Sequence, residues 1–272
     1  MEGISGLTDP EEMHPQGRGY ERGVELMTGD ANAAVAGAHE AGADSVVVTD
    51  AHSSGKNLRA DLVDTRCSLV RGPYRPLRMG EGLDGTCRAA MFVGYHARAG
   101  TSHGVLNHTW MGKEIHNVYL NGEVTGEIRL IAALAGTMGV PVALVTGDEA
   151  ACAEARELLG DVATVPVKRG IDRFAAELVP PPRAQEEIRR AAIQALESLE
   201  RFEPYIVPPP YTLGVEWNST AIAHACTAVP GVRLVGPRHT EITSNDYGDI
   251  VGALGLFSTV GGSIGCSSGI YG

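Results

Sequence analysis

Four short runs of apolar and β-branched residues, separated by helical patterns, constrain the fold of this chain more than any other feature. The runs lie at residues 45–49, 89–93, 141–145 and 163–167. Each has the length and composition of a buried strand. Helical patterns follow two of them, at residues 128–135 and 148–159. This alternation is typical of a mostly parallel sheet with flanking helices, so the sequence predicts an α/β fold.

Two proline clusters, at residues 180–182 and 208–210, interrupt this alternation. The elements expected beyond the first cluster are an amphipathic helix at 184–202, a strand at 211–217, a helix at 220–228 and a final segment at 249–260. We therefore predict an α/β domain at residues 1–180 and a smaller C-terminal α+β lobe at residues 181–272.

The N-terminal region begins with an unusual loop and continues with two predicted helices. Residues 1–6 have the character of a loop that follows a strand, and we expect an apolar first strand to be encoded upstream of Met1. Two helical segments come next, the first from Tyr20 to Met27 and the second with Thr28 as its N-cap.

Charge and composition narrow the classes of partner. The net charge of −11, without any basic block, argues against nucleic acid or an anionic membrane, since both require a positive surface. No apolar run reaches the roughly 20 residues of a membrane-spanning helix. The five cysteines are scattered without a CxxC motif, which favours reduced thiols and a cytoplasmic location. Small solutes are therefore the expected partners.

Histidines and carboxylates mark the expected ends of these elements. His52 and His96 each follow an apolar run closely, and Glu127 stands at the start of a helical pattern. Because loops at the carboxyl ends of strands converge on one crevice, these side chains form a plausible ligand set for Zn²⁺ or a similar ion. Asp50 could orient His52 or cap its own loop. Isolated histidines are more often ordinary polar loop residues, so spacing alone leaves the metal site open.

A further histidine could take part in the chemistry. His108 lies in a polar loop after His96 and could act as general base or nucleophile beside a metal-bound carbonyl. His103 and His116 compete for this role, and the pattern alone does not separate the three.

Five motifs in order along the chain carry a family resemblance. They are MEGISG at 1–6, YERG at 20–23, DAHS at 50–53, GYHARA at 94–99 and NGEVTGE at 121–127. Together they resemble the M55 family of metallopeptidases, the D-aminopeptidases associated with dipeptide-transport operons. The resemblance covers essentially the whole chain.

The resemblance implies a dinuclear zinc site. Glu2 and His52 would hold one zinc, His96 and Glu127 the other, and His108 would match the catalytic histidine. The family's bridging aspartate stands two positions before the glutamate, a position that would precede Met1 in this chain. We accordingly expect the upstream strand to end in Asp.

The same resemblance implies a substrate and an assembly. The expected activity is the release of N-terminal D-residues or glycine from short peptides such as D-Ala-D-Ala, in a homodecameric ring with the sites facing an inner channel. One alternative is a ring protein that binds metal or peptide without hydrolysis. Another is a metal-dependent amidase of different specificity.

Overall fold

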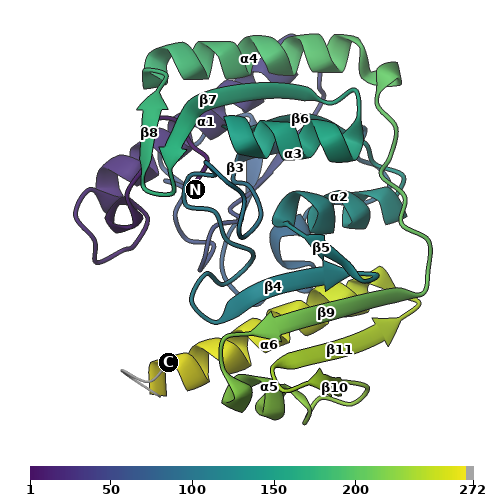
Figure 1. The fold of residues 1–272 in the computed structure, drawn as a ribbon. Helices are drawn as coiled ribbons and strands as arrows, with labels where there is room; N and C mark the ends of the chain where they lie inside the picture. Colours follow the sequence, from purple (N-terminus) through teal and green to yellow (C-terminus); the bar gives the residue numbers. More distant parts are fainter. Residues whose placement is uncertain (268–272) are drawn as a thin grey trace.

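A four-stranded sheet covered by helices on both faces forms the larger part of the molecule (Figure 1), whose computed structural model describes residues 1–267. In order across the sheet, its strands are β3 (Ala90–Tyr95), β6 (Val142–Asp148), β7 (Ala163–Asp172) and β8 (Ala175–Leu178). The first three are parallel, and β8 pairs antiparallel with β7. The predicted α/β class is thus confirmed.

Two pairs of helices cover this sheet. They are α2 (Glu127–Thr137) with α3 (Glu149–Leu159), and α1 (Tyr20–Glu40) with α4 (Pro181–Glu197). Ile128 of α2 and Ala151 of α3 share one apolar cluster with Val145 of β6. Ala34 of α1 and Ile188 of α4 share another cluster with neighbouring residues of the sheet. Each helix pair therefore seals one face, as parallel strands require.

The predicted strand at residues 45–49 is β1 (Val46–Thr49), which forms a separate parallel pair with β2 (Cys67–Val70). The sequence predicted one mostly parallel sheet, but β1 does not pair with β3 in the structure. A cavity of about 1620 Å³ is lined by residues of both β1 and β3. Strand periodicity describes each strand alone and carries no information on its partner, which is why the sequence did not predict this division.

An antiparallel sheet forms the smaller lobe. Across this sheet, the strands are β10 (Arg233–Gly236), β11 (His239–Ser244), β9 (Tyr211–Trp217), β4 (Ile115–Leu120) and β5 (Glu123–Thr125). Two helices pack on it, α5 (Thr220–Cys226) and α6 (Tyr247–Ser267). Short 3₁₀ helices lie at η1 (Pro10–Glu12), η2 (Arg78–Gly80) and η3 (Leu199–Arg201).

The boundary predicted at residue 180 does not separate the larger lobe, built on the four-stranded sheet, from the smaller lobe. β4 and β5 precede it, and β4 pairs with both β5 and β9, while α4 follows it and packs on α1. The proline cluster instead begins a helix, with Pro181 and Pro182 in its first turn, where a missing N–H costs nothing. Each lobe is thus assembled from both sides of this position.

The N-terminal helices also differ from the expectation. The structure has one continuous helix, α1, in place of two. Thr28 does not cap a second helix, because its hydroxyl donates to the Val24 carbonyl one turn earlier (2.8 Å). A threonine inside a helix commonly satisfies its hydroxyl in this way, so its N-cap preference was misleading.

Helix α6 corrects the expectation that no apolar run is long enough to span a membrane. By length and composition alone this helix could do so. Its buried residues Ile250, Leu254 and Phe257 pack in one cluster with Trp217 of β9. The apolar residues of α6 thus form part of the hydrophobic core of the smaller lobe.

Candidate metal centre

The five residues predicted to form the site come from four separate segments, because His96 and His108 share one loop. Glu2 lies in the N-terminal segment, His52 in the loop after β1, and His96 directly after β3. His108 belongs to the loop between β3 and β4, and Glu127 is the first residue of α2. The structure brings all five together, with Glu2, His96 and Glu127 buried.

Two carboxylates organise this centre. Oε2 of Glu2 lies 3.3 Å from Nδ1 of His52, and Oε2 of Glu127 lies 3.5 Å from Nε2 of His96. The pairs that the resemblance assigned to separate zinc ions are thus direct neighbours. Nε2 of His108 lies between them, 3.8 Å from Glu2 and 3.9 Å from Glu127. Its ring stacks on that of His96, with 4.2 Å between ring centroids.

Each imidazole presents one ring nitrogen to a backbone carbonyl and the other to a carboxylate. Nδ1 of His96 lies 3.0 Å from the Ala97 carbonyl, and Nδ1 of His108 lies 2.9 Å from the Leu106 carbonyl. Nε2 of His52 lies 3.4 Å from the carbonyl of Met13. Because a carbonyl only accepts hydrogen bonds, these nitrogens carry the proton. The opposite nitrogens face the carboxylates and would bind a metal in the neutral form of each ring, which is the usual arrangement of metal-binding histidines.

Burial and charge set the pKa values of four groups in the centre. Burial lowers the pKa of His96, but the Glu127 carboxylate outweighs it and raises this pKa to about 9. Burial likewise opposes ionisation of Glu127, but His96 brings its pKa down to about 2. Burial also raises the pKa of Glu2, but His52 and the N-terminal amine outweigh this effect and lower the pKa well below its usual value. Burial and the charge of His96 lower the pKa of His108, so its neutral form is favoured.

Zinc fits this set of donors. Imidazole nitrogens and carboxylate oxygens are among its usual ligands. One ligand atom from each of Glu2, His96 and His108 lies within 4.8 Å of the others. His108, predicted only for the chemistry, is therefore also near enough to coordinate an ion. The backbone N–H of Trp110 donates to Oε1 of Glu127 (2.8 Å) and orients this carboxylate.

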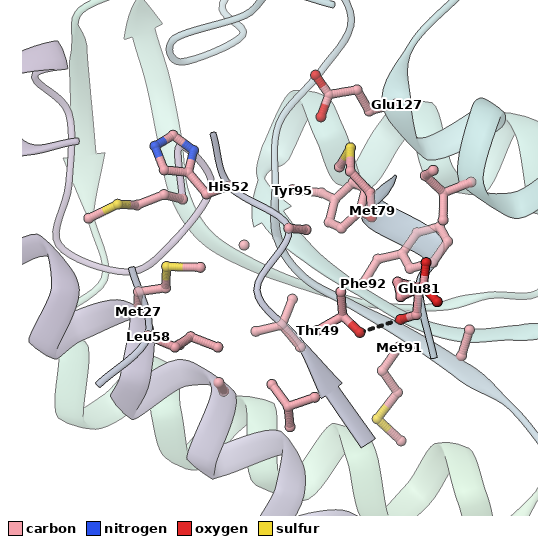
Figure 2. A pocket seen from close by; sticks show the side chains of 18 of the residues that line it. Met27, Thr49, His52, Leu58, Met79, Glu81, Met91, Phe92, Tyr95 and Glu127 are labelled. Atoms are coloured by element: carbon pink, nitrogen blue, oxygen red, sulfur yellow. Dashed lines mark hydrogen bonds between the residues drawn. The ribbon is translucent and has the colours of Figure 1, made fainter. Parts of the chain in front are cut away.

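The cavity described above opens onto the centre. His52 and Glu127 lie on opposite sides at one end of it, with Tyr95 between them (Figure 2). Leu58 and Phe92 line the part farther away.

The competing histidines lie elsewhere. Nδ1 of His103 contacts the Ile171 carbonyl at 3.1 Å, and His116 is exposed on β4. Asp50 does not orient His52. Its carboxylate accepts from the backbone N–H groups of Asn57 (2.5 Å) and Leu58 (2.7 Å), so it caps its own loop.

Sequence reasoning missed several buried charged residues behind the centre. They are Asp30, Asp148 and Lys168, each 1% exposed or less. The one available signal was a lysine within the apolar strand pattern of β7, because an ammonium is rarely buried without specific partners.

Comparison with known proteins identifies the family of the chain. The family model for peptidase M55, D-aminopeptidase, matches residues 1–256. The D-aminopeptidase of Bacillus subtilis strain 168 is 37% identical over 234 residues, which cover 86% of this chain and 85% of that protein. The structure is also similar to that of the Zn-dependent D-aminopeptidase DppA from Bacillus subtilis, a self-compartmentalizing protease. That match has a TM-score of 0.92 and 34% identity, and covers 96% of this chain and 95% of the other. The chain therefore belongs to the M55 family of D-aminopeptidases and is a metallo-aminopeptidase.

Proposed function

We propose that this chain is a zinc-dependent aminopeptidase that releases an N-terminal D-residue or glycine from short peptides such as D-Ala-D-Ala. The observation that carries the proposal is the convergence of Glu2, His52, His96, His108 and Glu127, each imidazole fixed by a backbone carbonyl. The relatives described as D-aminopeptidases support the substrate class.

Two zinc ions are proposed for each subunit. Glu2 and His52 would hold one, and His96 and Glu127 the other, in line with the two pairs of close contacts. Bound zinc would supply a polarised carbonyl and a water whose pKa falls from about 15.7 to about 7.

His108 is the proposed catalytic residue. Its Nε2 lies near both carboxylates, so a scissile carbonyl bound between the two pairs would be within its reach. Because its pKa is lowered, the ring is neutral near pH 7 and can accept a proton from the attacking water. The same ring would then donate this proton to the leaving amine. Direct attack of Nε2 on the carbonyl is the alternative route.

A homo-oligomeric ring is proposed as the working form. A relative with the same fold is described as self-compartmentalizing, and a decamer with inward-facing sites would exclude long substrates. The free state of all five cysteines supports the proposed cytoplasmic location.

The decisive experiment combines metal analysis with peptide hydrolysis. Purified protein should contain zinc in proportion to its activity on D-Ala-D-Ala, and L-Ala-L-Ala should be cleaved more slowly. A chelator should abolish activity, and added zinc should restore it. Full activity in a stringently metal-free preparation would refute the metal mechanism. Zinc binding without hydrolysis of any dipeptide or amide would favour a binding protein instead.

A further inference from the structure

A buried lysine holds the segment that carries Glu2. Lys168 of β7 is 1% exposed, and its ammonium donates to three backbone carbonyls of one short segment. The acceptors are Glu2 (2.6 Å), Ile4 (3.0 Å) and Leu7 (2.6 Å). All three N–H bonds of the ammonium are thereby used. The N-terminal segment is thus wrapped around a single charge.

Neutralisation of a neighbouring carboxylate does not explain this arrangement. Within residues 1–267, no ion pair joins Lys168 to a carboxylate. Asp148 faces it across the β6–β7 pairing, but the Asp148 oxygens accept from the N–H groups of Val105 (2.6 Å) and Ala151 (2.9 Å). A buried ammonium is costly unless it is fully hydrogen-bonded. Its direct contacts are with the backbone of the Glu2 segment.

Two other contacts restrain the same segment. The N–H and hydroxyl of Ser5 both donate to the buried carboxylate of Asp30, at 2.8 and 2.7 Å. The N–H of Gly3 donates to the Gly94 carbonyl (3.1 Å) at the end of β3. A Cβ at Gly3 would lie 1.7 Å from the Tyr95 carbonyl oxygen, so only glycine fits there. The segment is therefore held on three sides, close to His96.

We propose that Lys168 is a positioning residue for the metal centre, because its ammonium fixes the backbone that aims the Glu2 carboxylate at His52 and His108. The carbonyl of Glu2 is itself one of the three acceptors, so loss of the ammonium would release the residue that carries the ligand. Asp148 plays the matching part for the His108 loop through the Val105 N–H, three residues before this histidine. Adjacent strands thus secure the two segments that carry Glu2 and His108.

This inference rests on the proposed function, since it needs Glu2 to be a zinc ligand. The test compares Lys168→Met, which keeps the apolar stem of the side chain but donates no hydrogen bond, with wild-type protein. Zinc affinity by competition with a chelator should fall about 10- to 100-fold, the usual effect of removing support behind a ligand. The d–d absorption spectrum of the Co²⁺-loaded protein should change, and kcat should fall more than KM rises.

Ile188→Ala is the matched control. Ile188 is fully buried in the cluster on the α1 and α4 face of the sheet, so its truncation destabilises the fold without touching the Glu2 segment. This variant should have a lower Tm but wild-type zinc affinity and a wild-type Co²⁺ spectrum. Lys168→Met with unchanged affinity and spectrum would overturn the inference. An equal loss of both in Ile188→Ala would overturn it too, by showing a general effect of destabilisation.

A milder variant keeps the test decisive if Lys168→Met does not fold. Ser5→Ala removes one of the two donors to Asp30 from the same segment and retains the other. Ser5→Ala should weaken zinc binding severalfold, less than Lys168→Met does. Unchanged zinc binding would overturn the inference. Wild-type protein that binds no zinc would instead refute the proposed function, so the two failures are distinguishable.

Discussion

Replacement of His108 by alanine should abolish most turnover while zinc stays bound. General acid–base catalysis by a positioned imidazole contributes about 10²- to 10⁴-fold, which corresponds to about 2.7 to 5.5 kcal/mol of transition-state stabilisation. Nε2 of His108 lies 3.8 and 3.9 Å from the two carboxylates, so its loss leaves the pairs Glu2–His52 and Glu127–His96 in place. The fold should lose only about 1 kcal/mol for the hydrogen bond to Leu106.

The assay is steady-state hydrolysis of D-Ala-D-Ala together with zinc content by mass spectrometry. His108→Ala should show a kcat lower by at least about 100-fold and the same number of bound zinc ions. His103→Ala is the control, because His103 lies in the same loop but contacts Ile171 outside the centre. Loss of zinc in His108→Ala would show that His108 is a ligand, and a kcat defect in His103→Ala alone would refute the catalytic assignment of His108.

Further predictions concern the ligands, the pH dependence and the assembly. His96→Ala should lose both bound zinc and turnover, and retention of either would exclude His96 as an essential ligand. In metal-free protein the pKa of Glu127 is lowered from 4.5 to about 2, so its contribution to stability is present above pH 4.5 and lost as the pH falls toward 2. The pKa of His96 is raised from 6.5 to about 9, so its contribution is present below pH 6.5 and lost as the pH rises through 9. The Tm of the metal-free protein should therefore be highest between about pH 4.5 and pH 6.5 and fall on both sides. Zinc affinity should increase up to about pH 9, because zinc requires the neutral imidazole of His96. Dipeptides should be cleaved and folded proteins refused, and a monomer at micromolar concentration in sedimentation would contradict the ring.

Local pattern was informative where a residue's role depends on its immediate neighbours. The β-branched run before Thr49, the strand before His96 and the helix that starts at Glu127 were all predicted, because strand and helix periodicity are local properties. The same reasoning failed at Thr28, where the choice between capping a helix and continuing it depends on how α1 packs on the rest of the fold.

The site also combines properties set by local sequence with properties set by the tertiary structure. The sequence by itself determined the chemical types of the candidate ligands, and the family motifs predicted which histidines and carboxylates would meet. His103, His108 and His116 were equivalent by pattern, and only the loop between β3 and β4 decided that His108 enters the centre while the other two remain outside.

Tertiary structure alone decided which distant segments meet. It placed β4 beside β9, divided the predicted parallel sheet, and brought Lys168 to the Glu2 carbonyl across 166 positions of sequence. Side-chain periodicity records only whether a face is buried, whereas pairing and buried-charge contacts depend on the closure of long loops. Amino-acid pattern therefore determined the elements and their donor atoms, and the folded chain determined the geometry in which those atoms can act together.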